Sequence, residues 1–319
     1  MTTDLFERAT VTDGGMETDL VFHHGVDLPQ FAAYPLLRED RGRALLRDYY
    51  LGYAAIARRW GAGLLLETPT WRANPDWGAR LGDTLADLGA INAYAVQWLR
   101  GLRESALADL PEVRVGGMIG PRGDGYAADD LDAQASQAYH RPQVEALAAA
   151  GVDVVTAYTL TGRGEALGIV RAARAAGVPV GISFTVETDG RLPDGSTLSQ
   201  TMTALDASAA PDHYLLNCAH PRHIALAMAG LTPAQRPAIR GVRGNASPLS
   251  HADLDAATDL DEGDPEQFAA ATSALDALAP ALTIRGGCCG TDARHVAAAW
   301  ALAAAPRTSD APDRARRHP

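Results

Sequence analysis

The chain contains the stretch Gly286-Gly287-Cys288-Cys289-Gly290-Thr291, which follows an apolar run and precedes a helical pattern. A second stretch, Leu215-Leu216-Asn217-Cys218-Ala219-His220-Pro221, shows the same order of apolar run, sharp turn and helical pattern. Each apolar run is typical of a buried strand. If the two strands belong to one parallel barrel, the three cysteine side chains meet at the same rim.

The alternation of strand and helix patterns recurs about eight times along the chain, which indicates parallel strands with right-handed crossovers. About eight such units in this length fit a single-domain α/β fold, the (β/α)8 TIM barrel, over residues 1–305. The expected strands are 9–13, 63–67, 113–118, 151–157, 178–185, 212–217, 238–243 and 281–285. The expected helices are 39–60, 81–105, 140–150 with Pro142 in its first turn, 163–176 closed by Gly177, 197–209, 223–229, 265–278 and 291–305. A doubly wound open sheet is the alternative, and the Pro-, Arg- and Asp-rich tail 306–319 is expected to be disordered.

The composition argues against several classes of protein. With 319 residues, 47% of them hydrophobic, the chain can bury a large core. A net charge of −11 without a basic stripe argues against nucleic acid or an anionic membrane as a partner. No apolar run approaches the roughly 18 residues of a membrane span, and no signal peptide is recognisable. Three cysteines, two of them adjacent, argue against a disulfide framework and favour a reducing, cytoplasmic location.

Polar residues and glycines cluster after the expected strands, where the catalytic residues of a (β/α)8 barrel are found. Cys218 ends the sixth expected strand, and Cys288 and Cys289 follow the eighth, so the three can share one site. Three thiolates without a fourth protein ligand suit a catalytic zinc (Zn²⁺), which keeps one position open for substrate. Two other interpretations are open. A buried cysteine can serve as a small apolar side chain, or the adjacent pair can act in redox chemistry, which leaves Cys218 without a role.

A set of motifs resembles the homocysteine S-methyltransferase family, which includes S-methylmethionine- and betaine-dependent enzymes and the first module of cobalamin-dependent methionine synthase. The motifs are Asp13-Gly14-Gly15-Met16, Gly120-Pro121, Tyr139-His140-Arg141-Pro142, Ser183-Phe184-Thr185, Asn217-Cys218 and the stretch 286–291. The resemblance covers roughly residues 8–304. It implies zinc held by Cys218, Cys288 and Cys289, which also serve catalysis. It further implies methyl transfer from a small sulfonium or quaternary ammonium donor to a small thiol. Homocysteine is the leading candidate for this thiol, and its methylation gives methionine.

The sequence departs from this family at two strand ends. Tyr158 stands where members usually carry a Glu that helps to hold the amino group of homocysteine, and tyrosine brings no negative charge. Arg243-Gly244-Asn245-Ala246-Ser247 replaces the frequent Tyr-Pro-Asn-Ser-Gly. Asp13 is then the main candidate anion for the substrate ammonium, with Glu67 and Glu187 as compensating candidates. The expected substrate-binding residues are Asp13, Gly14, Gly15, Glu67, Tyr158, Asn217 and Asn245.

Four aromatic residues in the expected loops, Trp71, Trp77, Tyr126 and Tyr158, are candidates for a cation–π face toward the donor. Other functions remain open alternatives. The chain can take its methyl group from a corrinoid partner protein, methylate another small thiol, or hold zinc or sense thiols without catalysis.

Overall fold

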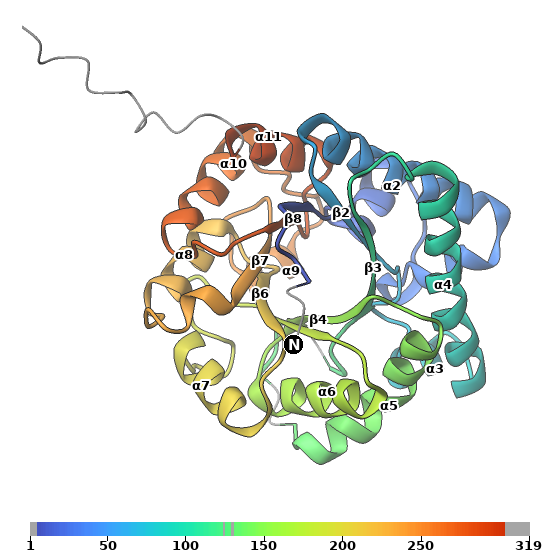
Figure 1. Cartoon of the computed structure of the whole chain (residues 1–319), viewed down its shortest axis with the longest axis horizontal. Helices are drawn as coiled ribbons and strands as arrows, with labels where there is room; N and C mark the ends of the chain where they lie inside the picture. Colours follow the sequence, from blue (N-terminus) through green and yellow to red (C-terminus); the bar gives the residue numbers. More distant parts are fainter. Residues whose placement is uncertain (1–4, 124, 129–130, 304–319) are drawn as a thin grey trace, which may run out of the picture.

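The computed structural model describes residues 5–123, 125–128 and 131–303, and its strands form a closed parallel barrel (Figure 1). The strands are β1 (Thr10–Val11), β2 (Gly63–Glu67), β3 (Val113–Ile119), β4 (Val154–Leu160), β5 (Val180–Phe184), β6 (His213–Asn217), β7 (Ile239–Gly244) and β8 (Ile284–Gly287). Each strand pairs with the next along the chain, and β1 also pairs with β8, where Thr10 faces Ile284. The predicted (β/α)8 barrel is therefore confirmed, and the closure of β1 on β8 rules out the open sheet.

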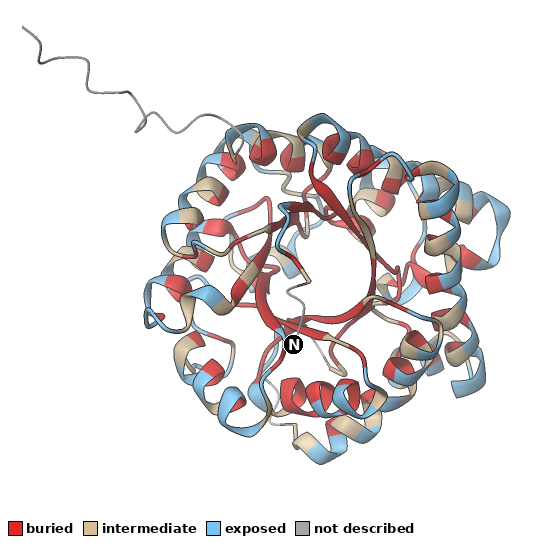
Figure 2. Ribbon diagram, viewed as in Figure 1, coloured by how far each residue is buried: buried red, intermediate tan, exposed pale blue. Residues whose placement is uncertain are grey.

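Helices surround the barrel and bury their inner faces against it, as the colours of Figure 2 show. They are α1 (Met16–Thr18), α2 (Asp40–Trp60), α3 (Pro75–Arg80), α4 (Leu85–Ala106), α5 (Ala133–Ala149), α6 (Arg163–Ala176), α7 (Leu198–Ala209), α8 (Pro221–Ala229), α9 (His251–Ala256), α10 (Pro265–Ala274) and α11 (Ala293–Ala303). A π-helical turn, η1 (Asp19–His23), and 3₁₀ turns at η2 (Pro29–Phe31), η3 (Tyr34–Arg38), η4 (Arg236–Ala238) and η5 (Leu275–Ala277) complete the described elements.

Strand alternation divides the core into two layers, one inside the barrel and one between barrel and helices. In β2, Leu65 belongs to the cluster inside the barrel, whereas Leu64 and Leu66 belong to the outer layer. Because both faces of such a strand are buried, the sequence is apolar throughout rather than alternating. The same two-residue period turns Glu67 toward the barrel interior.

The helix predicted at 140–150 is present, but its predicted start is wrong, so Pro142 does not lie in its first turn. Helix α5 begins at Ala133, because the Asp132 side chain accepts hydrogen bonds from the backbone N–H groups of residues 134 and 135, both at 2.9 Å. Pro142 thus lies inside the helix and removes one backbone hydrogen bond. Next to it, the buried His140 lies 2.7 Å from Glu165 of α6, so tertiary contacts hold this part of α5 in place.

Strand β4 extends three residues further than predicted, so Tyr158 and Thr159 belong to the strand and not to the loop after it. The register shifts between Ala157 and Leu160, and Thr159 has a φ of 62°, which is rare for a β-branched residue. Helices α3 and α9 occupy stretches where only loops were expected. The predicted boundary at residue 305 and the tail 306–319 lie outside the described residues.

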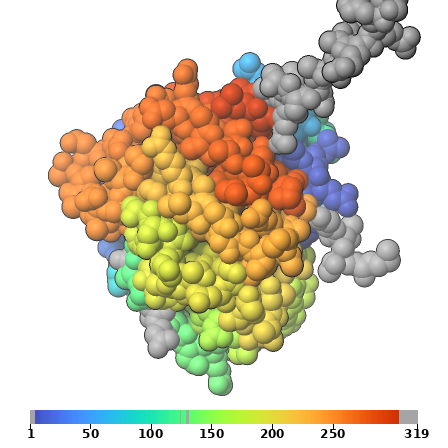
Figure 3. All heavy atoms as spheres, turned by 90° about the vertical axis from the view of Figure 1, so that its left-hand side faces the viewer, coloured from blue at the N-terminus to red at the C-terminus, as the bar shows by residue number. Residues whose placement is uncertain are grey.

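Figure 3 shows the face on the side of α7, α8 and α10, which residues of the second half of the chain, coloured yellow to red, largely make up. Within the described ranges, no helix has both the length and the apolar character that crossing a membrane requires.

Candidate functional site

The three cysteines meet at the C-terminal mouth of the barrel. Cys218 directly follows β6, and Cys288 and Cys289 directly follow β8. The Sγ atom of Cys218 lies 3.0 Å from that of Cys288 and 3.6 Å from that of Cys289. All three sulfur atoms lie within 4.8 Å of one another. The structure therefore brings together the residues that the sequence placed at two separate strand ends.

The backbone turns sharply at both cysteine positions. Cys218 itself adopts a left-handed φ of 56°, and Gly290 directly after the adjacent pair has a φ of 76°. A non-glycine residue in this region is uncommon and marks a position that its surroundings hold in place. On the other side of the cluster, a Cβ atom at Gly15 would lie 2.4 Å from the Cys288 carbonyl oxygen. Glycine at position 15 thus lets the loop after β1 pack directly on the cysteine loop.

The chemistry of the cluster fits a zinc ion. A tetrahedral zinc with Zn–S bonds of about 2.3 Å places neighbouring sulfur atoms roughly 3.8 Å apart. The Cys218–Cys289 spacing of 3.6 Å is close to this value, and the Cys218–Cys288 spacing of 3.0 Å is shorter. Hydrogen bonding with Cys218 and Cys289, together with the nearby Arg243 guanidinium, lowers the pKa of Cys288 well below its usual range. Hydrogen bonding within the cluster raises the pKa of Cys289 in turn. Soft sulfur donors that share negative charge are the ligand type that favours zinc over Mg²⁺ or Ca²⁺.

The backbone carbonyl of Cys218 is bound by a histidine, which in turn contacts a carboxylate. His251 Nε2 lies 2.6 Å from the Cys218 carbonyl oxygen, and its Nδ1 lies 3.1 Å from Glu187. This arrangement fixes the backbone of a cysteine whose φ is positive. His251 lies in a stretch where no helix was expected. Ser250 and Asp253 nevertheless form an S-x-x-D helix start that indicates α9, and the Ser250 side chain does cap that helix.

Tyr126 contacts the sulfur atoms directly. Its hydroxyl lies 3.2 Å from Cys218 Sγ and 3.7 Å from Cys289 Sγ. Its ring stacks on His251 with centroids 4.2 Å apart. The sequence suggested Tyr126 only as a cation–π candidate, because nothing local shows that the loop after β3 reaches across to β6.

A cavity of about 450 Å³ opens beside the cysteines. Of the expected substrate-binding residues, Asp13, Gly14, Gly15, Tyr158 and Asn217 line it, whereas Glu67 and Asn245 are not among its lining residues. The cavity wall also includes Tyr126, which was expected only as a cation–π candidate, and Glu17 and Arg243, for which no substrate-binding role was expected.

Asp13 is paired with a buried arginine. Arg243 Nη2 lies 2.5 Å from Asp13 Oδ1 and donates to the Gly14 carbonyl at 3.0 Å, and Arg243 Nε donates to the Gly287 carbonyl at 3.0 Å. Burial would lower the pKa of Arg243, but Asp13 and other neighbouring groups raise it well above its usual range. Although burial raises the pKa of Asp13, the 2.5 Å ion pair is the stronger indication that both groups are charged. The Asp13 carboxylate, which was expected to bind the substrate ammonium group, is therefore already paired with Arg243.

Tyr158 and Glu67 form a second pair beneath the cavity wall. The Tyr158 hydroxyl donates to Glu67 Oε1 at 2.7 Å, and Glu67 Oε2 is buried without a hydrogen-bond partner among the described residues. Gly116 makes room for this carboxyl group, since a Cβ atom there would lie 2.2 Å from Oε2. Burial raises the pKa of Glu67 to about 7. Glu67 therefore does not line the cavity itself but holds the side chain of Tyr158, which does.

The two asparagines differ in their surroundings. The Asn217 side chain accepts from Thr159 N at 2.9 Å and from Ser183 Oγ at 2.7 Å, and its Nδ2 lies 3.8 Å from Cys288 Sγ. It therefore ties the ends of β4, β5 and β6 to the cysteine cluster. The Asn245 amide is buried, and neither of its polar atoms has a hydrogen-bond partner within the described chain.

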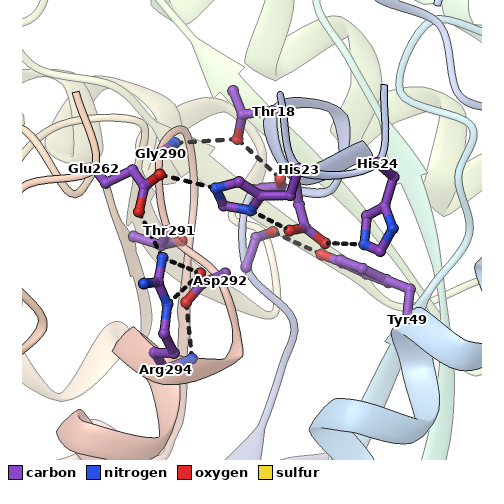
Figure 4. A network of polar contacts seen from close by, with 12 residues as sticks. Thr18, His23, His24, Tyr49, Glu262, Gly290, Thr291, Asp292 and Arg294 are labelled. Atoms are coloured by element: carbon purple, nitrogen blue, oxygen red, sulfur yellow. Dashed lines mark hydrogen bonds and ion pairs between the residues drawn. The ribbon is translucent and has the colours of Figure 1, made fainter. Parts of the chain in front are cut away.

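A polar network beside the cluster braces the loops around it (Figure 4). His23 lies 3.0 Å from Glu262, and Arg294 donates to the same carboxylate at 2.5 Å and lies 2.6 Å from Asp292. The His23, Glu262 and Asp292 side chains are close enough to share a metal ion. Because Arg294 already neutralises both carboxylates, we interpret this group as a structural brace between η1, the loop before α10 and the start of α11.

Known proteins of similar sequence and fold agree with the barrel architecture of this chain. The homocysteine S-methyltransferase family model matches residues 10–302. A homocysteine S-methyltransferase of Escherichia coli (strain K12) is 31% identical over 173 residues, which cover 50% of this chain and 54% of that protein, so the chain spans about half the length of this curated relative. The homocysteine methyltransferase MmuM from Escherichia coli is similar in its metallated crystal form, with a TM-score of 0.69 and 26% identity, and in its oxidized form, with 0.71 and 25%. Each of these comparisons covers 94% of this chain and 97% of the MmuM chain.

Proposed function

This chain belongs to the homocysteine S-methyltransferase family, and we propose that it transfers a methyl group from a sulfonium or quaternary ammonium donor to the thiol of homocysteine, giving methionine. The observation that carries this proposal is the meeting of three cysteine sulfur atoms beside a cavity of about 450 Å³ at the barrel mouth. A thiol has an ordinary pKa near 8.5, so a methyltransferase acting on it near neutral pH needs a site that favours the thiolate.

We propose that Cys218, Cys288 and Cys289 hold a zinc ion, which their spacing and soft donor atoms fit. Zinc bound there supplies the charge that keeps an acceptor thiol deprotonated at neutral pH. MmuM, a homocysteine methyltransferase of similar fold, has a metallated crystal form, which supports the proposal that this chain holds a metal ion.

The chain's own residues position the cluster and the substrates. His251 and Asn217 hold the two cysteine loops, and the Tyr126 hydroxyl lies against two of the sulfur atoms, where it limits access of water. Such positioning matters because aligning donor carbon and acceptor sulfur can lower the barrier by several kcal/mol.

The aromatic residues on the wall are not equally available to a cationic donor. Arg72 lies 4.1 Å from the Trp71 ring centroid and 3.6 Å from that of Trp77, so a cation already faces both rings. Phe22 and Phe31 also line the cavity, and Phe22 is 48% exposed. We propose that the onium group of the donor lies against these two phenylalanines, where a cation–π contact contributes about 0.5–2 kcal/mol.

A single assay with metal analysis tests the proposal. Purified protein is loaded with zinc and incubated with homocysteine and either S-methylmethionine or a betaine, without a second protein, and methionine is measured by mass spectrometry. We expect about one tightly bound zinc per chain and methionine formation, both lost in Cys218→Ala because one of three ligands is removed. The control is Glu104→Gln, on the exposed face of α4.

Two outcomes would contradict the proposal. Unchanged methyl transfer by Cys218→Ala would exclude the cysteine cluster as the reaction site. Methyl transfer only after addition of a methylated corrinoid protein would show that the donor class is wrong.

A further inference from the structure

Two charged side chains of opposite sign, Glu17 and Arg243, line the cavity and have no part in the cysteine cluster. Glu17 belongs to α1, directly after the Asp13-Gly14-Gly15 turn, and Arg243 is the next-to-last residue of β7. Strand β7 pairs with β8, which in turn pairs with β1, so both residues flank the loop that carries Cys288.

Arg243 is fixed in place but keeps donor capacity. Its contacts with Asp13, Gly14 and Gly287 use Nε and the hydrogens of Nη2. A guanidinium has five N–H groups, so Arg243 keeps donor hydrogens beyond these three contacts, for the Tyr158 hydroxyl, with which it also interacts, and for a ligand. A buried guanidinium held this way suits a carboxylate, because the planar fork loses little freedom on binding.

Glu17 supplies a negative charge that the protein does not neutralise. In the described part of the chain, its carboxylate joins no ion pair and accepts no side-chain hydrogen bond, whereas Asp13 is paired with Arg243. Burial disfavours the charged form and raises the pKa of Glu17, and the nearby charge of Arg243 opposes this shift. A cation placed beside Glu17 would stabilise the charged form of its carboxylate and so offset the cost of burying that charge.

We propose that Glu17 and Arg243 together recognise the amino-acid head of the thiol acceptor, with Glu17 binding its ammonium group and Arg243 its carboxylate. This inference rests on the proposed function and names the residues that select the acceptor. Tyr158 cannot replace Glu17 in this role, because its hydroxyl donates to Glu67 and offers an ammonium group only a neutral acceptor.

Binding measurements with trimmed acceptors test the inference without any methyl transfer. Calorimetric titration of the zinc-loaded protein compares homocysteine with mercaptobutyrate, which lacks the ammonium group, and with mercaptopropylamine, which lacks the carboxylate. Since a charged hydrogen bond changes affinity about 10- to 100-fold, the wild type should bind homocysteine more tightly than either trimmed ligand by this factor.

Each variant should weaken only the ligands that carry the group which the replaced residue is proposed to bind. Glu17→Gln is expected to weaken homocysteine and mercaptopropylamine about 10- to 100-fold and to leave mercaptobutyrate unchanged. Arg243→Lys retains a counter-charge for Asp13 but loses the fork, so it should weaken homocysteine and mercaptobutyrate and spare mercaptopropylamine. Glu104→Gln should change none of the three affinities. If Arg243→Lys does not fold, the ligand series on the wild type and on Glu17→Gln still decides.

Equal effects of Glu17→Gln on all three ligands would overturn the inference, as would wild-type affinity for mercaptobutyrate equal to that for homocysteine. The expected binding pattern without methyl transfer from any onium donor would support the inference and refute the proposed function instead.

Discussion

Replacing Glu67 by Gln should stabilise the protein at alkaline pH, although Glu67 lies beside the candidate site. Glu67 is fully buried, and its Oε2 has no hydrogen-bond partner within the described residues. Burial raises its pKa from 4.5 to about 7. The folded state therefore holds the proton more tightly than the unfolded state. Its contribution to stability is full below about pH 4.5 and is lost as the pH rises to about 7.

The size of this effect follows from the raised pKa. One pH unit corresponds to about 1.4 kcal/mol, so ionised Glu67 costs about 3 kcal/mol above pH 7. Gln has nearly the same shape, can still accept from Tyr158, and does not titrate. Between about pH 5 and about pH 8, the free energy of unfolding of Glu67→Gln should gain roughly 2.5 kcal/mol relative to the wild type.

Urea unfolding of both proteins at these two pH values, with chelator and reductant present, measures this gain. Glu104→Gln is the matched control and should show no pH-dependent difference, because Glu104 is exposed. The reasoning is refuted if the difference does not change with pH, or if Glu67→Gln is less stable than the wild type at about pH 8. Either result would mean that Glu67 is ionised in the folded state and stabilised there by its neighbours.

Three further substitutions test the support of the site. His251→Ala removes the hydrogen bond to a cysteine carbonyl and should weaken zinc binding about 10- to 100-fold in a chelator competition; unchanged affinity would contradict the supporting role. Gly15→Ala places a methyl group 2.4 Å from the Cys288 carbonyl oxygen and should lower the free energy of unfolding by about 1–3 kcal/mol in urea, whereas Gly52→Ala, with open space around it, should not. Hydrogen bonds to its two carboxylate partners raise the pKa of His23, so its charged form stabilises the fold fully below about pH 6.5, and this contribution is lost as the pH rises through the folded-state pKa. The stability difference between wild type and His23→Gln should therefore be larger at about pH 6 than at about pH 9, and equal differences would speak against a charged brace.

The sequence by itself determined the barrel and the meeting of the cysteines. Both depend on local periodicity and on one general rule, that successive parallel strands with helical crossovers lie side by side. Because the carboxyl ends of all strands face the same rim, Cys218 and the pair Cys288-Cys289 could be placed together without any knowledge of side-chain contacts. The start of α5 was missed because the cap at Asp132 competes with an apparent helix start at Pro142, and only packing decides between them.

Only the tertiary structure decided which charges face the substrate. Asp13 and Arg243 are far apart in the sequence, and no local pattern shows that an arginine of β7 neutralises the carboxylate after β1. Glu67 and Tyr158 likewise find each other only inside the closed barrel. The physical reason is that strand periodicity is a local property of the backbone, whereas the state of a buried charge depends on every group that surrounds it in space.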